Sequence, residues 1–99
     1  MVRHIVAWNF KEGFTEAENR ENALRVKAEI EALPQWIDGI VKIEVKIDLM
    51  STSTRAVVLD SLFVSEEALE AYVVHPEHKR AAAFVGSVFQ DRVCLDYHE

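Results

Sequence analysis

The chain has 99 residues, which is enough for a single hydrophobic core and too few for two. Its 17 acidic and 11 basic residues give a net charge of −6. Nucleic acids and anionic membrane surfaces both require a basic patch, so this balance argues against either as the main partner. The hydrophobic content of 49%, with three glycines and two prolines, is typical of a globular protein and excludes disorder. We therefore expect one domain over residues 1–99.

Membrane, secretory and disulfide-linked classes are also excluded. No apolar run approaches the roughly 20 residues that span a bilayer, and the opening Met-Val-Arg-His lacks a signal-peptide core. We expect a cytoplasmic protein that binds no membrane. The one cysteine, Cys94, has no disulfide partner, and neither paired-cysteine nor His-Glu-x-x-His spacing is present. The sequence thus predicts no metal and no cofactor, with Cys94 as a small core residue.

The first predicted elements are a strand and a helix. Residues 2–10 alternate between two faces, which predicts a strand. Thr15 and Glu18 have the spacing of a capping box, which predicts a helix that begins at Thr15. Pro34 ends this helix, because a residue before proline avoids the helical conformation. The apolar residues between these limits recur at helical spacing: Ala23, Val26, Ile30 and Leu33.

Two more strands follow. Residues 41–49 alternate strictly, with Val41 on the apolar face, and this pattern predicts a half-buried strand. The polar residues 51–54 are expected to form a loop. Residues 55–64 are apolar on both faces, so this third strand must be covered on both sides.

The last third of the chain predicts a broken helix and a final strand. Ser65, followed by two glutamates, is typical of a helix N-terminus. Pro76 breaks this helix and suits the first position of a new one, which we expect to end at Gly86. Residues 92–97 predict the last strand.

The order of these elements is that of an α+β, ferredoxin-like βαββαβ fold with a four-stranded antiparallel sheet. Two helices can cover only one face of such a sheet. The second apolar face of the third strand then needs another partner, and a second copy of the chain is the simplest candidate. We therefore expect a homodimer that forms through the face of the sheet.

The densest group of chemically active side chains is the run Tyr-Val-Val-His-Pro-Glu-His, from Tyr72 to His78. We expect His75 to cap the helix that Pro76 begins. His78 falls in the first turn of that helix, where the positive helix end favours a neutral imidazole. Tyr72 lies one turn back as a hydroxyl donor, so the two residues form a candidate catalytic acid–base pair. The competing interpretation is structural, with His75 as a cap and His78 bonded to a backbone carbonyl.

Two residues of the first strand are candidates for binding a ligand. His4 and Trp8 share its apolar face and are expected to point into the interior. In a mostly apolar pocket, His4 would be a polar anchor and Trp8 part of the wall. The structural alternative is a hydrogen-bonded core histidine, with Trp8 and Trp36 serving only to pack.

These motifs resemble the stress-responsive A/B-barrel (Dabb) family over nearly the whole chain. The residues that carry the resemblance are His4-Ile5-Val6 with Phe10-Lys11, Leu33-Pro34 to Gly39-Ile40, Tyr72-x-x-His75-Pro76-x-His78 and Val93 to Tyr97. The resemblance implies a ferredoxin-like fold and homodimers in which two sheets close an α/β barrel.

The resemblance also implies a chemistry. The family includes a plant polyketide cyclase, which closes a linear poly-β-keto thioester by an intramolecular aldol reaction. Its catalytic histidine and tyrosine match His78 and Tyr72, and its N-terminal pocket histidine matches His4. By this resemblance His78 removes the acidic proton, Tyr72 holds the carbonyl or thioester oxygen, and the ligand is a small apolar, aromatic or ketide molecule. The first helix and residues 51–54 do not match the cyclase.

Three functions stay open on the sequence. The first is a cofactor-free acid–base enzyme that cyclises or isomerises a small molecule. The second is a non-catalytic stress-response dimer that binds a ligand and has structural histidines. The third, by fold analogy alone, is a haem-degrading or quinol-oxidising monooxygenase. The first two differ in whether His4, Tyr72 and His78 meet at an open cavity or in a filled core.

Overall fold

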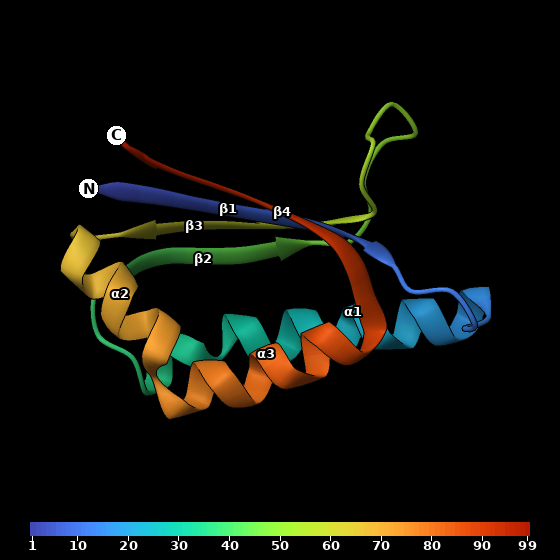
Figure 1. The fold of residues 1–99 in the computed structure, drawn as a ribbon, viewed down its shortest axis with the longest axis horizontal. Helices are drawn as coiled ribbons and strands as arrows, with labels where there is room; N and C mark the ends of the chain where they lie inside the picture. The colour runs from blue at the N-terminus through green and yellow to red at the C-terminus, as the bar shows by residue number, and fades with distance from the viewer.

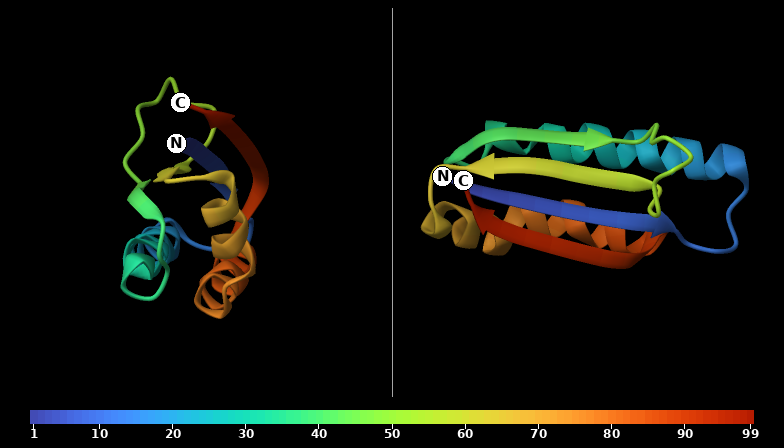
Figure 2. Two further views of the ribbon diagram at one scale, coloured as in Figure 1. Left: turned by 90° about the vertical axis from the view of Figure 1, so that its left-hand side faces the viewer. Right: turned by 90° about the horizontal axis from the view of Figure 1, so that it is seen from above.

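The computed structural model describes residues 1–99 and confirms the predicted α+β, ferredoxin-like fold (Figure 1). The elements, in chain order, are β1 (Val2–Phe10), α1 (Glu16–Glu31), a short 3₁₀ helix (Leu33–Gln35), β2 (Ile40–Lys46), β3 (Val57–Phe63), α2 (Glu66–Val74), α3 (Pro76–Val88) and β4 (Phe89–His98). The strands form one antiparallel sheet in the order β2-β3-β1-β4. All helices lie on one face of this sheet (Figure 2).

The helices begin at the predicted caps. The Thr15 hydroxyl accepts a hydrogen bond from the Glu18 amide at 3.1 Å, and the Glu18 carboxylate accepts one from the Thr15 amide at 2.8 Å. The Ser65 hydroxyl accepts a hydrogen bond from the Ala68 amide at 3.1 Å, at the start of α2. These contacts satisfy amide donors that a helix leaves free at its first turn. None of the helices is both long and apolar enough to cross a membrane.

The predicted second strand is wrong in two respects. β2 ends at Lys46 instead of residue 49. The pairing with β3 shifts register between Ile40 and Lys42, and Val41 is 49% exposed instead of lying on the apolar face. Such an irregularity adds one residue to a strand and moves its side chain out of the alternation, which strict alternation in the sequence does not reveal.

The predicted end of the last helix is also wrong. α3 continues through Gly86 as far as Val88, and β4 therefore begins at Phe89 instead of residue 92. A Cβ at Gly86 would meet no atom within 4 Å, so this glycine faces open space within the helix. Glycine is tolerated inside a helix at a cost of roughly 1 kcal/mol and does not always end one.

Gly39 determines how closely α2 approaches the start of β2. Its φ of +87° lies in the left-handed region, which glycine adopts without strain. A Cβ at this position would lie 2.7 Å from the Ala68 Cβ of α2. The helix therefore packs against bare backbone at this point.

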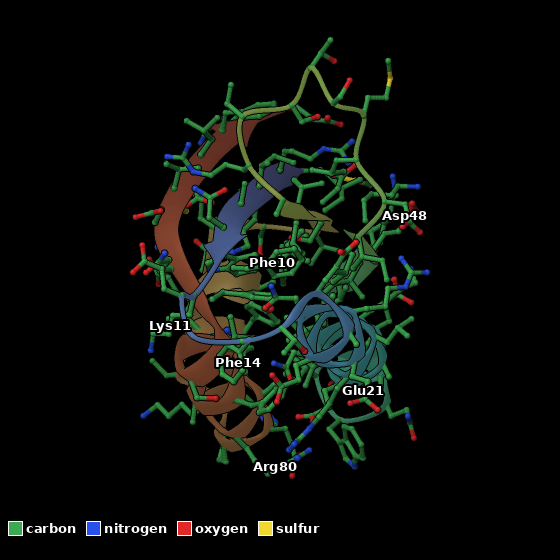
Figure 3. All side chains as sticks on the ribbon, turned by 90° about the vertical axis from the view of Figure 1, so that its right-hand side faces the viewer. Phe10, Lys11, Phe14, Glu21, Asp48 and Arg80 are labelled. Carbon is green, nitrogen blue, oxygen red and sulfur yellow. The ribbon has the colours of Figure 1, made fainter.

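The core fills the layer between the helices and the sheet. Phe10 closes this layer at the end of the molecule that faces the viewer in Figure 3. Burial of one large apolar side chain contributes roughly 1.5–3 kcal/mol, so this layer holds the helices in place on the sheet. Its buried members from β1, β3 and α1 are Val6, Trp8, Val57, Leu59, Phe63, Ala23, Val26 and Ile30.

The opposite face of the sheet carries no helix (Figure 2). Leu95 is 64% exposed there and Tyr97 is 50% exposed. The loop between β2 and β3 rises on this same side (Figure 1). The strand pairings place seven apolar residues on this uncovered face: Ile5, Ala7, Val58, Leu62, Val93, Leu95 and Tyr97. The third strand is thus apolar on both faces, as the sequence predicts.

Candidate functional site

A cavity of about 360 Å³ lies between the helix-facing side of the sheet and α3. His4 and Trp8 reach it from β1, Tyr72 from α2 and His78 from α3. The four residues predicted as catalytic or ligand-binding therefore line one cavity. Nine of its fifteen lining residues are hydrophobic, so the few polar side chains determine where a polar ligand atom can bind.

His75 caps the helix that carries His78, as predicted. Its Nδ1 accepts a hydrogen bond from the Glu77 amide at 3.1 Å. Pro76 occupies the first position of α3, and the extended backbone of His75, with ψ of 136°, separates α3 from α2. His75 does not line the cavity, so it acts on local structure.

His78 is a half-buried histidine with a free acceptor nitrogen. Its Nδ1–H donates to the Val73 carbonyl at 3.0 Å, which leaves Nε2 of the neutral ring as an acceptor. Burial lowers the pKa of His78 against the opposing effect of the Val73 bond, and the charges of His4, Arg92 and His75 lower it further. The expected cause was the helix end, but burial is the largest one. A neutral, accepting imidazole is the form that a general base requires.

Tyr72 supplies a donor without a partner. The residue is 1% exposed, and its buried hydroxyl makes no hydrogen bond. Burial raises the pKa of Tyr72, so the phenol stays protonated. Its ring lies against His78 with centroids 4.3 Å apart, although no direct hydrogen bond joins the two. An unpaired buried hydroxyl costs roughly 1–3 kcal/mol, which a ligand oxygen in the cavity would recover.

His4 has a partner that the sequence did not reveal. Its Nδ1 lies 2.5 Å from the Asp96 carboxylate, directly across the β1–β4 pairing. His4 is only 6% exposed, whereas the Asp96 side chain is 46% exposed. The carboxylate therefore orients the imidazole from the solvent side. The alternation of both strands is visible in the sequence, but the register that pairs these two residues is not.

The two tryptophans have different roles. Trp8 is 6% exposed, lines the cavity and packs on Phe89 with ring centroids 5.6 Å apart. Trp36 is 49% exposed, so its expected packing role is wrong. It follows the 3₁₀ helix in a short connection, where helical or strand periodicity gives no guide to burial.

Cys94 is exposed, and its predicted place in the core is wrong. Its Sγ lies 3.9 Å from Nδ1 of His4 and 3.7 Å from Oδ2 of Asp96. Partial burial and the nearby Asp96 carboxylate raise the pKa of the thiol. Cys94 is therefore not an activated nucleophile.

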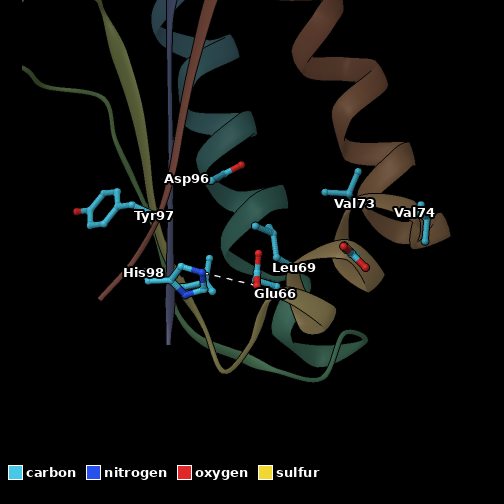
Figure 4. A pocket seen from close by; sticks show the side chains of 9 residues that line it. Glu66, Leu69, Val73, Val74, Asp96, Tyr97 and His98 are labelled. Carbon is cyan, nitrogen blue, oxygen red and sulfur yellow. Dashed lines mark ion pairs between the residues drawn. The ribbon is translucent and has the colours of Figure 1, made fainter.

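A second cavity, of about 590 Å³, lies between α2 and the end of β4 (Figure 4). At its edge, His98 Nε2 lies 3.6 Å from a Glu66 carboxylate oxygen. Asp96 lines this second cavity while it bonds to His4, which lines the first. The His4–Asp96 pair thus stands between the two cavities, and Tyr72 and His78 belong only to the first.

The site is suited to proton transfer and not to nucleophilic attack. A neutral His78 accepts a proton and a protonated Tyr72 donates a hydrogen bond. Neither serine nor cysteine is among the residues that line the first cavity.

Solved structures with the same fold cover nearly the whole chain. A dimeric ferredoxin-like protein of unknown function from Bacteroides fragilis has 32% identity and a TM-score of 0.91, over 99% of this chain and 95% of that chain. A protein from Arabidopsis thaliana has 20% identity and a TM-score of 0.80, over 100% and 95%. A dimeric ferredoxin-like protein of unknown function from Thermobifida fusca has 21% identity and a TM-score of 0.80, over 99% and 90%. The last two show likeness of fold alone.

The sequence itself matches a family and no single curated protein. None of the curated proteins matches the chain. The profile of the stress responsive A/B barrel domain, Dabb, matches residues 2–99. These residues include all four strands and every residue that lines the first cavity. The chain therefore belongs to the Dabb family, as the resemblance in its sequence predicted.

Proposed function

We propose that the protein is a homodimeric, cofactor-free acid–base enzyme of the polyketide-cyclase or isomerase type. The observation that carries this proposal is the unpartnered, buried hydroxyl of Tyr72 beside the neutral imidazole of His78 in one cavity. A donor aimed at a developing oxyanion and an unprotonated base are the two groups that proton removal next to a carbonyl requires.

The proposed reaction begins with a proton transfer from carbon. Nε2 of His78 takes the proton next to a carbonyl group, and the electron pair of the broken C–H bond moves into an enolate. Tyr72 donates a hydrogen bond to the enolate oxygen. In a cyclisation, the enolate carbon then attacks a second carbonyl, and the new alkoxide takes the proton back from His78. In an isomerisation, the proton returns to a different carbon. General acid–base catalysis of this kind contributes about 10²–10⁴-fold.

The size and lining of the cavity favour a small, mostly apolar ligand. Its volume of about 360 Å³ is near the lower end of the roughly 300–1,000 Å³ of ligand pockets. Trp8 offers a flat apolar wall for an aromatic ring or a short ketide. His4, held by Asp96, supplies a polar anchor.

The homodimer is proposed to form through the uncovered face of the sheet. Seven apolar side chains on that face have no helix to cover them, and contiguous apolar surface of this kind marks an interface. The related Bacteroides fragilis and Thermobifida fusca proteins are described as dimeric. Two sheets packed face to face would close an α/β barrel, with each cavity on the helix side and away from the partner.

The main competing function is a non-catalytic ligand-binding dimer. The two functions are separated by measuring binding and proton transfer on the same molecule. In a Trp36→Phe background, Trp8 is the only tryptophan, and its fluorescence reports occupancy of the cavity by an aryl ketone such as acetophenone. Deuterium exchange of the ketone's α-protons, followed by NMR, reports proton transfer.

We expect the protein to accelerate this exchange and His78→Asn to remove about 10²-fold or more of the acceleration. His98→Ala is the matched control, because His98 is exposed and lies outside the first cavity. Binding without accelerated exchange in the unsubstituted protein would favour the non-catalytic dimer. Equal exchange with and without His78 would assign the base to another group.

A further inference from the structure

We infer that His4, Cys94 and Asp96 form a binding site for a Zn²⁺ ion. One ligand atom from each residue lies within 4.8 Å of the other two. The three side chains supply nitrogen, sulfur and oxygen; His4 lines the first cavity and Asp96 lines the second. His78 and Tyr72, the acid–base pair of the proposed function, are not ligands of this site, whereas His4 and Asp96 belong to both proposals.

The pairing of two strands brings the ligands together. His4 of β1 is directly opposite Asp96 of β4, and Val6 is directly opposite Cys94. Residues directly opposite each other share a face, so His4, Asp96 and Cys94 all project toward the helices. Cys94 and Asp96 are two residues apart on one strand, and His4 is the direct neighbour of one and the diagonal neighbour of the other. Ligands held on strands are positioned more rigidly than ligands on loops.

The separations are close to those of a tetrahedral zinc site. Nδ1 of His4 is 3.9 Å from Sγ of Cys94, and Sγ is 3.7 Å from Oδ2 of Asp96. Zinc bonds of about 2.0–2.3 Å at tetrahedral angles place ligand atoms roughly 3.3–3.8 Å apart. Only the 2.5 Å contact between Nδ1 and Oδ1 of Asp96 is too short. The Asp96 side chain is 46% exposed, so there is room on its solvent side for the carboxylate to turn away from Nδ1 when a metal enters.

The ligand set selects the metal. Thiolate, imidazole and carboxylate together favour Zn²⁺ over Mg²⁺ or Ca²⁺, which prefer oxygen ligands. Three protein ligands leave a fourth position for water. On binding, the Cys94 thiol releases its proton to solvent. The proton on Nδ1 of His4 is replaced by the metal, and the neutral ring carries its proton on Nε2.

Neighbouring groups hold His4 in place for this role. The Ser61 hydroxyl donates a buried hydrogen bond of 2.7 Å to the His4 carbonyl. The imidazole lies edge-on to Phe63 and to Tyr72, each with ring centroids 6.2 Å apart. These contacts restrict the backbone and the ring of His4, as the surroundings of a metal ligand do.

The test is a titration of the full chain, kept reduced, with Co²⁺ as a spectroscopic probe and Zn²⁺ as competitor. We expect a near-ultraviolet band from the thiolate–cobalt bond, visible bands of tetrahedral cobalt, saturation at one Co²⁺ per chain, and loss of the signal when Zn²⁺ is added. Bound Zn²⁺ should also slow alkylation of Cys94 by iodoacetamide. Both readouts are independent of catalytic activity.

Two variants test proposed ligands, and a third is their control. Cys94→Ser should abolish the near-ultraviolet band, and Asp96→Asn should weaken Co²⁺ binding by about tenfold or more. His98→Ala is the matched control, because this exposed histidine lies two residues beyond Asp96 on β4 and should leave the titration unchanged. Circular dichroism confirms that each variant is folded. The inference is overturned if the unsubstituted protein shows no near-ultraviolet band, or if the band persists in Cys94→Ser. A loss of Co²⁺ binding in His98→Ala would also overturn it.

Discussion

The imidazole of His78 lies against the phenol ring of Tyr72, with ring centroids 4.3 Å apart, yet their polar ends do not bond to each other. Nδ1 of His78 bonds the Val73 carbonyl, and the Tyr72 hydroxyl bonds nothing. The two rings therefore pack together, while Nε2 of His78 and the hydroxyl of Tyr72 both stay available to a ligand. A core designed only for stability would pair or remove such a hydroxyl.

Removing that hydroxyl separates stability from ligand binding. Tyr72→Phe should leave the free energy of unfolding unchanged or raise it by about 1 kcal/mol, because the substitution removes an unpaired buried polar group. The same variant should bind an aryl ketone about tenfold more weakly, since it lacks the donor to the carbonyl oxygen. Urea denaturation and Trp8 fluorescence measure the two quantities. A clear loss of stability in Tyr72→Phe would mean that the hydroxyl has a structural partner.

The helix cap that His75 forms at the start of α3 should contribute to the stability of the fold and not to the chemistry of the site. His75→Ala removes the acceptor for the Glu77 amide and should lower the free energy of unfolding by about 1 kcal/mol. His75→Asn, which supplies another capping side chain, should restore most of that loss. Urea denaturation of the three proteins checks this order. The capping role fails if His75→Ala is as stable as the unsubstituted protein.

The partial burial of His78 should make the protein less stable in mild acid. Its pKa is lowered below the ordinary 6.5, mainly by burial and also by the charges of His4, Arg92 and His75. Below about pH 6.5 the unfolded chain therefore binds a proton on this residue before the folded chain does. Stability rises with pH wherever the unfolded state binds more protons, so this contribution increases toward pH 6.5 and then levels off.

Comparison with His78→Asn isolates this effect. The difference in free energy of unfolding between the two proteins should be constant above about pH 7 and should shift against the unsubstituted protein as the pH falls below 6.5. Urea denaturation across that range gives the difference at each pH. Parallel pH profiles for the two proteins would show that His78 titrates as it does in an unfolded chain.

The uncovered face of the sheet gives a prediction about assembly. Val58 and Leu95 lie on that face, whereas Val57 is fully buried on the helix side. Leu95→Asp or Val58→Asp should therefore dissociate the proposed homodimer and leave the monomer folded, because neither side chain enters the core. Sedimentation velocity at micromolar concentration gives the mass, and circular dichroism gives the fold. If the unsubstituted protein already sediments as a monomer, the proposed homodimer is wrong.

The fold could be predicted because its signals are local. Apolar residues on both faces predicted the third strand and its two covered sides, and the Thr15–Glu18 pair predicted the start of α1. The features that were missed depend on space around a residue. Val41 leaves the apolar face through a register shift in pairing, and Gly86 stays helical because nothing crowds it. Neither the register shift nor the open space can be predicted from the residues next to Val41 and Gly86 in the sequence.

The candidate site divides in the same way. The spacing of Tyr72, His75 and His78 indicated a cap and an acid–base pair, since all three lie on adjoining helical turns. Asp96 and Cys94 lie beside His4 only because of the register of β1 with β4, which pairs His4 with Asp96, 92 positions later in the chain. That register depends on the packing of the whole sheet.

The left-handed backbone at Gly39 is linked to the position of Tyr72 in the cavity. α2 rests against this glycine through Ala68, one helical turn before Tyr72. Even a methyl group at residue 39 would collide with Ala68, so α2 would have to shift and carry Tyr72 with it. The seat of the tyrosine in the cavity thus depends on a glycine that does not itself line the cavity.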